Sequence, residues 1–137
     1  MADTIELELV SPEKLLLSEQ VEMVVIPGED GDFGVLPGHS PVISNIRPGV
    51  LSVFENGAVA DRIFVASGFA EVTAERCTIL AEGATPVEDL DRAAVEQQIQ
   101  EFREDAANAA DDVSRTRANN ALAVAEAKRI AITAPAY

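Results

Sequence analysis

The chain has 137 residues, a length that allows one domain with a hydrophobic core, or a small domain with an appendage. Apolar residues make up 47% of the chain and charged residues 25%, close to globular averages, which argues against a disordered protein. The formal net charge of −14 repels phosphate backbones and anionic headgroups, and so argues against nucleic-acid binding and direct lipid binding.

The first six residues show no targeting pattern. They combine neither a basic region nor an apolar stretch, and two of them, Asp3 and Glu6, are acidic. We therefore expect neither a secretory signal nor an organellar transit peptide. No apolar run approaches the ~20 residues that a membrane-spanning helix needs. These features predict a protein of the cytoplasm.

Up to about Pro86 the sequence has the pattern of short β-strands. In residues 5–9 apolar and acidic side chains alternate at period two, which predicts one buried and one solvated face. Asn56-Gly57 favours a two-residue hairpin, because both turn positions need a positive φ. Short strands without intervening helices predict an all-β sandwich of two antiparallel sheets. Further strands are expected at residues 21–26 (ended by Pro27-Gly28), 50–54, 62–66, 69–73 and 77–80, with turns at Ser67-Gly68 and Glu75-Arg76.

The single cysteine and the single histidine limit the chemistry available to the protein. Cys77 lies in a run of alternating apolar residues and is expected to be a small core residue, not a nucleophile. His39 alone cannot build a multi-histidine metal site. The sequence has no Walker-type phosphate loop and no serine nucleophile elbow. We therefore expect no catalytic residue, no metal site and no enzyme.

After Pro86 the apolar period changes to three and four residues. Asp89 is expected to cap a first helix, with Asp91 in its first turn. A turn at residues 108–112 and a second helix from about 113 to 130 would complete an antiparallel α-helical hairpin. The chain then divides into a β-sandwich at residues 1–86 and a hairpin at residues 87–137. The apolar stripe expected on the hairpin consists of Val95, Ile99, Phe102, Ala106, Ala109, Ala110 and Val113.

The second helix is expected to be basic and to bury little apolar area, because it is rich in alanine. Within residues 113–130 four cations stand against Glu126 alone, which gives 4 − 1 = +3 and leaves −14 − 3 = −17 for the remainder. Two interpretations are open: a solvated helix that pairs with the acidic first helix, or a basic arm that reaches an acidic partner. The four cations are Arg115, Arg117, Lys128 and Arg129.

The most informative segment is residues 27–49, which read PGEDGDFGVLPGHSPVISNIRPG. Its glycines permit tight turns around a group of carboxylates, and Pro37 and Pro41 stiffen the loop so that it presents His39 in a defined place. This segment resembles the signature of the epsilon subunit of bacterial and chloroplast F-type ATP synthases, called delta in mitochondria. The resemblance covers the whole chain. It includes residues 5–11 before Pro12, the strand from Val21, residues 67–72, and residues 89–91 at the start of the helices.

The resemblance implies a non-catalytic rotor subunit. The family's N-terminal domain is a sandwich of ten strands in two sheets of five, followed by a helical hairpin. It binds the gamma subunit and the ring of c subunits in the central stalk, which couples proton translocation to ATP synthesis. A bacterial member would lie on the cytoplasmic face of the plasma (inner) membrane as a peripheral part of the complex. Contacts with the alpha and beta subunits would be transient.

The resemblance also assigns contacts to particular residues. The c-ring contact would be made by Glu29, Asp30, Asp32 and Phe33, and the gamma contact by Ser11, His39 and Ser44. In many bacterial relatives the hairpin extends along gamma towards acidic segments of the beta subunits and inhibits ATP hydrolysis. Here the residues for such an inhibitory arm are Arg115, Arg117, Lys128 and Arg129.

One motif departs from the family pattern. Some relatives bind ATP on the hairpin through Ile/Leu-Asp-x-x-Arg-Ala, whereas Leu90-Asp91 is followed here by Arg92-Ala93-Ala94-Val95. Arg92 therefore comes two positions early, which turns a helical side chain by about 200° to the opposite face. We expect no bound cofactor.

Two other interpretations compete with a stalk subunit. A free-standing β-sandwich could bind a small ligand or carbohydrate and use the hairpin for dimerisation. This would account for the strands and helices, but not for the Pro-x-His-x-Pro loop or the basic second helix. An enzyme is the third interpretation, and it would need a His-Asp-Ser arrangement assembled in space.

Overall fold

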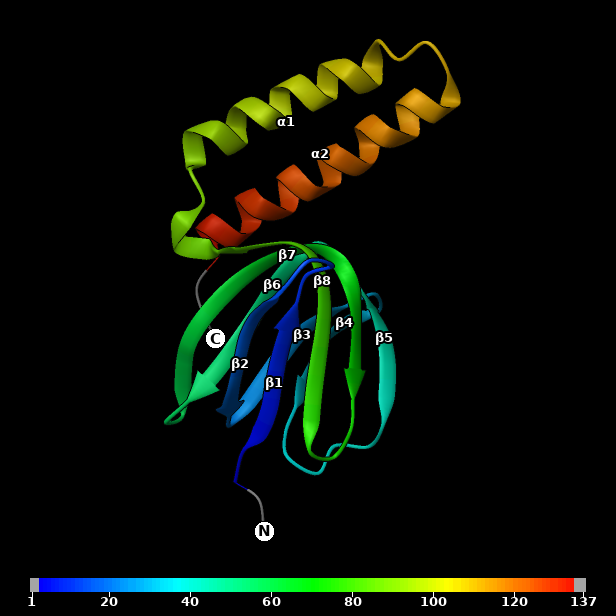
Figure 1. Cartoon of the computed structure of the whole chain (residues 1–137). Helices are drawn as coiled ribbons and strands as arrows, with labels where there is room; N and C mark the ends of the chain where they lie inside the picture. Colours follow the sequence, from blue (N-terminus) through cyan, green and yellow to red (C-terminus); the bar gives the residue numbers. More distant parts are fainter. Residues whose placement is uncertain (1–2, 135–137) are drawn as a thin grey trace.

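A computed structural model of the protein describes residues 3–134 and has a β-sandwich with a helical hairpin at one end (Figure 1). This confirms the expected fold class. The strands are β1 (Ile5–Val10), β2 (Leu15–Val21), β3 (Met23–Gly28), β4 (Gly31–Val35), β5 (Val42–Ile46), β6 (Gly49–Glu55), β7 (Ala58–Val72) and β8 (Arg76–Pro86). The helices are the short 3₁₀ helix η1 (Val87–Asp89), α1 (Arg92–Ala107) and α2 (Asp112–Thr133).

Two long strands belong to both layers of the sandwich. One layer contains β2, β1, β8, β7 and β5, and the other contains β4, β3, β6, the first half of β7 and the end of β8. The resemblance implied ten strands, whereas the structure has eight, because β7 and β8 bend and continue from layer to layer. One pair departs from the antiparallel arrangement: β1 and β8, the first and last strands, run parallel.

The expected turn at Ser67-Gly68 is wrong, because β7 continues through both residues. Gly68 has a φ of 146°, and a Cβ at this position would lie 2.0 Å from the carbonyl oxygen of Leu80 on β8. The glycine therefore serves a close approach of two backbones at the bend of a strand. The expected end of a strand at Pro27-Gly28 is confirmed, although both residues still belong to β3, which ends at Gly28. A strand bend and a turn both favour glycine, so composition does not separate them.

The sandwich core consists of the alternating apolar strand residues. Ile5, Leu7 and Leu9 on β1 are buried, which confirms the predicted alternation with Glu6 and Glu8. Cys77 is buried in the same cluster, and burial raises the pKa of its thiol to about 12. This confirms Cys77 as a core residue. The hairpin at Asn56-Gly57 is also confirmed, with φ of 54° and 78° between β6 and β7.

The first helix begins slightly later than expected. Asp91, not Asp89, is its N-cap, since its carboxylate accepts hydrogen bonds from the backbone N–H groups of Ala93 and Ala94. Asp89 instead belongs to η1. Asp111 caps α2 by accepting from the N–H of Ser114 at 2.7 Å, which lowers the pKa of its carboxyl group.

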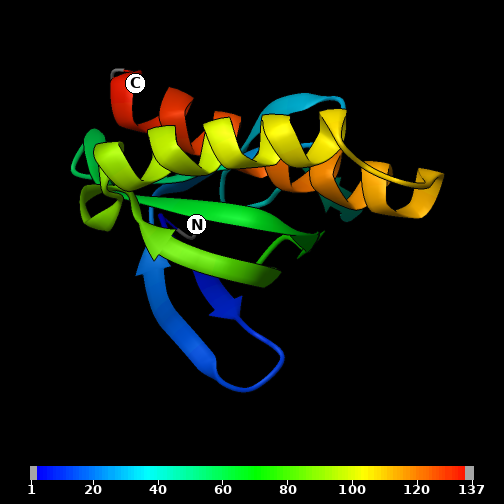
Figure 2. The ribbon, with the colours of Figure 1, turned by 90° about the horizontal axis from the view of Figure 1, so that it is seen from above.

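The two helices form a small core of their own. Val95 and Ile99 on α1 are buried with Ala125 of α2, and Phe102 packs against this cluster. Val113 is 69% exposed, so the predicted apolar stripe does not extend past the turn between the helices. Figure 2 shows α1 and α2 lying along one another above the strands. None of the helices between residues 3 and 134 combines the length and the apolar character that a membrane span requires.

Candidate functional site

The acidic turn predicted as a contact site connects β3 and β4. Glu29 and Asp30 are the two exposed turn residues between Gly28 and Gly31. The turn is tied to β5, since Asn45 donates from Nδ2 to the Glu29 carboxylate at 3.1 Å and accepts from the Glu29 N–H at 2.9 Å. Asp30 makes no hydrogen bond or ion pair with any residue between 3 and 134. Its carboxylate is therefore available to a partner.

The third carboxylate of this loop is already paired. Asp32 on β4 forms an ion pair with Arg47 at 2.6 Å, and the same guanidinium donates to the carbonyl of Gly28 at 2.6 Å. Arg47 thus fixes the ends of β3 and β4 to the corner between β5 and β6. Sequence reasoning missed this residue because the pair spans fifteen positions and depends on how the strands meet.

Five of the predicted contact residues line one open hollow. It encloses about 340 Å³ and is bordered by Gly28, Gly31 and Val42 together with Asp30, Asp32, Phe33, His39 and Ser44. The structure therefore brings residues assigned to two different partners, the c-ring and gamma, onto one continuous surface.

His39 is held in place at the edge of this hollow. Its Nδ1 lies 2.7 Å from the carbonyl oxygen of Ser40, and since a carbonyl can only accept, Nδ1 carries the proton and donates it. The N–H of the preceding Gly38 donates to Ala74 at 2.8 Å, which ties the loop to the turn between β7 and β8. Ser44 donates its hydroxyl to the carbonyl of Asn45 at 3.0 Å.

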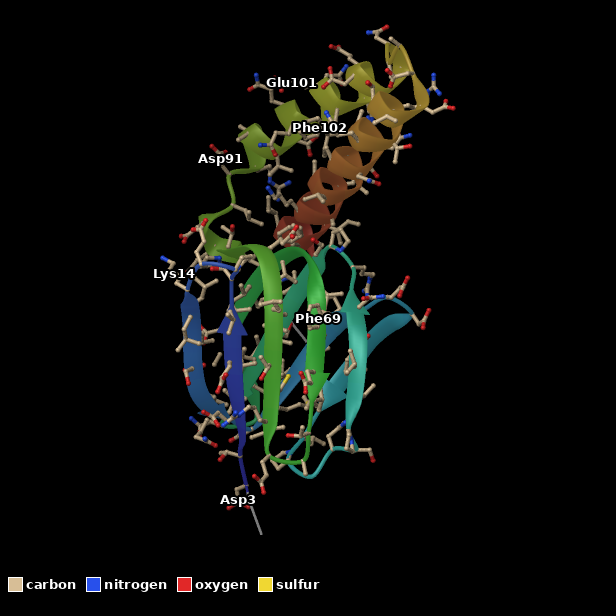
Figure 3. All side chains as sticks on the ribbon, turned by 45° about the vertical axis from the view of Figure 1, so that its right-hand side comes forward. Asp3, Lys14, Phe69, Asp91, Glu101 and Phe102 are labelled. Atoms are coloured by element: carbon tan, nitrogen blue, oxygen red, sulfur yellow. The ribbon has the colours of Figure 1, made fainter. Side chains whose placement is uncertain are left out.

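Ser11 lies apart from the hollow, in the turn between β1 and β2. Its hydroxyl donates to the carbonyl of Lys14 and accepts from the Lys14 N–H, both at 3.2 Å. Figure 3 shows Lys14 at the end of the sandwich that faces the helices. Ser11 therefore closes a turn, and the structure does not bring it together with His39 and Ser44.

An apolar stripe crosses the outer face of the layer that contains β1 and β8. Phe69 on β7 pairs with Leu80 on β8, Leu80 pairs with Val10 on β1, and Val10 pairs with Leu15 on β2. Phe69, labelled in Figure 3, is 42% exposed and Leu15 is 57% exposed. Ile43 on β5 extends the stripe and is 73% exposed.

This apolar stripe (Ile43, Phe69, Leu80, Val10 and Leu15) is a candidate interface that sequence reasoning did not identify. Apolar side chains gathered on the solvated face of a sheet commonly mark a protein–protein contact. Each member looks like an ordinary strand residue in the sequence. Only the register of five neighbouring strands places them in a row.

The four cations of the predicted arm separate into two pairs on α2. Arg115 and Arg117 are exposed near the turn between the helices, where Arg115 pairs with Asp112 at 2.8 Å. Arg117 has no ion pair within the described part of the protein. At the other end, the ammonium of Lys128 lies 5.9 Å from the centre of the Phe64 ring, and Arg129 pairs with Glu96 of α1 at 3.6 Å. Pairing with the first helix is thus observed for Arg129.

No group of three or more histidine, cysteine or acidic side chains is arranged to hold a metal ion among residues 3–134. Cys77 and His39 do not form a pair, since the thiol is buried in the core and the imidazole lies at the hollow. The surfaces described above are suited to contact with other proteins.

Two family models match the sequence in succession. The beta-sandwich domain of the ATP synthase delta/epsilon chain matches residues 4–87, and the C-terminal domain of the ATP synthase epsilon chain matches residues 91–137. The protein is 53% identical over 133 residues to an ATP synthase epsilon chain from Rhodospirillum centenum, covering 93% of this chain and 91% of the relative. It is 51% identical over 127 residues to that of Rhodospirillum rubrum, covering 93% and 95%.

Two solved structures have a similar fold. A chain in the OSCP/F1/c-ring structure of Euglena gracilis mitochondrial ATP synthase superposes with a TM-score of 0.86 at 27% identity, covering 96% of this chain and 83% of that one. A chain in the central stalk/c-ring structure of Tetrahymena thermophila mitochondrial ATP synthase gives a TM-score of 0.60 at 14% identity, covering 94% and 96%. The second likeness concerns the fold alone.

Proposed function

The chain belongs to the family of ATP synthase epsilon chains, and from this premise we propose that it is a rotor subunit in the central stalk of a bacterial F-type ATP synthase. It performs no bond chemistry itself. It binds gamma and the c-ring on the cytoplasmic face of the plasma membrane, and so couples proton translocation to ATP synthesis. The observation that carries this proposal is the match of both family domains, in order, along the sequence.

The acidic turn and the hollow form the contact with the c-ring in this proposal. Glu29 and Asp30 present two carboxylates on a rigid turn, and Asp32 and Phe33 lie directly behind them. Carboxylates attract cationic and polar groups and steer association. The polar loops of a rotor ring are partners that such carboxylates can bind. His39 and Ser44, on the same hollow, lie where gamma and the ring would meet, and Ser11 contacts gamma from its separate turn.

The apolar stripe forms the larger part of the gamma contact. Its exposed members, Ile43, Phe69 and Leu15, lie on one rigid sheet, and a partner that covers them removes apolar area from water without reordering the backbone. Stable interfaces have such an apolar centre with a polar rim. Glu71, paired with Ile43 on the neighbouring strand, belongs to that rim.

The hairpin acts as an inhibitory arm in this proposal. Arg115 and Arg117 lie at its far end and are exposed, so they can meet acidic segments of the beta subunits. Lys128 and Arg129 contact Phe64 and Glu96 in the folded protein. Lys128 leaves Phe64 and becomes available to alpha and beta only when the hairpin leaves the sandwich, whereas the Arg129–Glu96 pair lies within the hairpin and moves with it.

Introducing one charged residue into the apolar stripe tests the proposed gamma contact. Ile43→Asp should weaken binding to purified gamma by about tenfold or more, since burying an isoleucine side chain stabilises by about 1.5–3 kcal/mol. The matched control is Val113→Asp, because Val113 is similarly exposed, at 69%, but lies on the hairpin. Affinity is measured with immobilised gamma. Equal affinity of both variants and the wild type would remove the stripe from the gamma contact.

A further inference from the structure

One side chain of the sandwich meets the last turn of α2. Arg62 on β7 donates from Nη2 to the carbonyl oxygens of Ala131 at 3.1 Å and Ala134 at 3.4 Å. The last carbonyls of a helix have no partner within the helix and form its negative end. The last turn of α2 has no basic residue of its own. A guanidinium from another element, sixty-nine positions away in the sequence, supplies the missing donor.

The apolar surface around these two hydrogen bonds is small. Phe64 and Val87 of the sandwich end are buried against Ala131, the one fully buried α2 residue at this place among those described. Val124 and Ala127 are only partly buried there, and Ile130 is 64% exposed. The side chain of Ala131 is a single methyl group and buries little apolar area. Apolar burial alone therefore holds α2 only weakly against the sandwich. The polar contact therefore carries a large share of the docking.

The hairpin can leave the sandwich without losing its own core. The cluster of Val95, Ile99 and Ala125 lies between α1 and α2 and includes no sandwich residue among those described. Figure 1 shows that α2 approaches the strands with its C-terminal end, while the turn between the helices projects away. Only Leu90 and Asp91 connect η1 to α1. These features favour movement of the hairpin as a unit about a short connection.

We infer that Arg62 is a latch that holds the hairpin against the sandwich by capping the C-terminal end of α2. Arg62 is a positioning residue: it decides whether Lys128 of α2 remains on Phe64 of the sandwich or becomes available. The Arg129–Glu96 pair lies within the hairpin and moves with it. Breaking the contact shifts the population towards the undocked hairpin, because hydrogen bonds from a charged donor are stronger than neutral ones. The inference rests on the proposed inhibitory arm only for its effect on ATP hydrolysis.

The test measures hairpin position in the isolated full-length protein. Spin labels on Ala58→Cys in the sandwich and Ala110→Cys at the hairpin tip report the distance between them. Cys77 is buried and its thiol stays neutral, so it does not take up the label in the folded protein. The wild type should give one narrow distance distribution. Arg62→Met should add a broad population at other distances and raise the undocked fraction about tenfold or more.

Two further variants sharpen the result. Arg62→Lys keeps the charge and can still donate to a carbonyl, so it should restore most of the docked population. Arg103→Met is the matched control, because Arg103 is exposed on α1 and its side chain makes no ion pair or hydrogen bond within residues 3–134. We expect methionine to be tolerated at position 62, because this side chain lines a hollow with Leu9, Leu17 and Val87, although Asp61 and Glu88 also border it. If circular dichroism shows that Arg62→Met does not fold, the uncharged Arg62→Gln replaces it, and its undocked fraction should still exceed that of the wild type.

If the uncharged variant at position 62 gives the same distance distribution as the wild type and Arg103→Met, that result overturns the inference that Arg62 is a latch. A separate measurement, ATP hydrolysis by the reconstituted synthase carrying Arg62→Met, concerns the inhibitory arm. If the hairpin is released in the isolated protein but hydrolysis does not fall, the latch holds and the proposed inhibition is wrong.

Discussion

Three carboxylates in the acidic loop, close together in the sequence, have different roles in the structure. Asp32 is paired with Arg47 and fixes two strand ends, whereas Glu29 is only hydrogen-bonded to Asn45. Asp30 has no such contact among the described residues. Exposed ion pairs contribute about 0–1 kcal/mol each, so no single one of these carboxylates can dominate an interface. Glu29 and Asp30 are the two that can act together on a partner without disturbing the fold.

Neutralising these two residues tests the c-ring contact. Glu29→Gln with Asp30→Asn, which leaves the Asp32–Arg47 pair intact, should weaken attachment to the rotor ring by up to about thirtyfold, because two rim contacts of up to ~1 kcal/mol each are lost. Proton-driven ATP synthesis in vesicles should fall accordingly. Glu104→Gln with Asp105→Asn makes the same change of charge on α1 and should have no effect. Unchanged synthesis in the first double variant would argue against this contact.

At the scale of elements, α2 is divided between two tasks. Its C-terminal end docks on the sandwich through Ala131 and Arg62, and its N-terminal end presents Arg115 and Arg117 to solvent. A helix built mainly of alanine is intrinsically stable but binds no surface strongly. This combination suits an element that must keep its shape while it moves between two positions. The charges at its exposed end are those that a distant acidic partner would meet first.

The proposed inhibitory role of the hairpin is tested at the tip, where Arg115 and Arg117 lie. Arg115→Ala with Arg117→Ala should raise the rate of ATP hydrolysis by the reconstituted synthase at low salt, because an attraction to acidic segments is lost. The difference from the wild type should shrink as salt rises, since the screening length is about 10 Å at 0.1 M and about 3 Å at 1 M. Arg92→Ala with Arg103→Ala removes the same charge from α1 as the control. Equal rates for all three proteins would mean that these arginines do not inhibit.

At the scale of the whole molecule, the sandwich and the hairpin have separate cores. The sandwich cluster draws only on strand residues, the hairpin cluster only on α1 and α2, and a small third cluster joins them around Phe64. The acidic turn, the hollow and the apolar stripe all lie on the sandwich. The proposed function therefore assigns attachment to the rotor to the sandwich and regulation to the hairpin.

A fragment of residues 1–86 tests this division. It should unfold cooperatively in urea, because its own core remains complete, and it should bind gamma with the affinity of the full-length protein within a factor of about two to three. Binding is compared on the same gamma surface as for the Ile43 variant. A fragment that neither folds cooperatively nor binds gamma would contradict the division at Pro86.

The features that the sequence determined by itself are local. Alternation along β1, the hairpin at Asn56-Gly57 and the change to helical period after Pro86 involve residues within a few positions of one another. Backbone preferences and side-chain periodicity act over this range, and for that reason they are readable from one sequence. The order of the glycines, prolines and His39 in residues 27–49 was specific enough to indicate the family.

The remaining features were decided only by the tertiary structure. The pairing of Asp32 with Arg47, the row of apolar residues across β2, β1, β8 and β7, and the contact of Arg62 with α2 each join distant positions. In the sequence, Gly68 looks like a turn residue. Only the position of the Leu80 carbonyl on β8 shows that glycine is needed there because two backbones approach closely. Such contacts depend on strand register and on which surfaces meet. A shift of one residue in the register moves every side chain of a strand to the opposite face of the sheet. Neighbouring residues in the sequence do not contain that information.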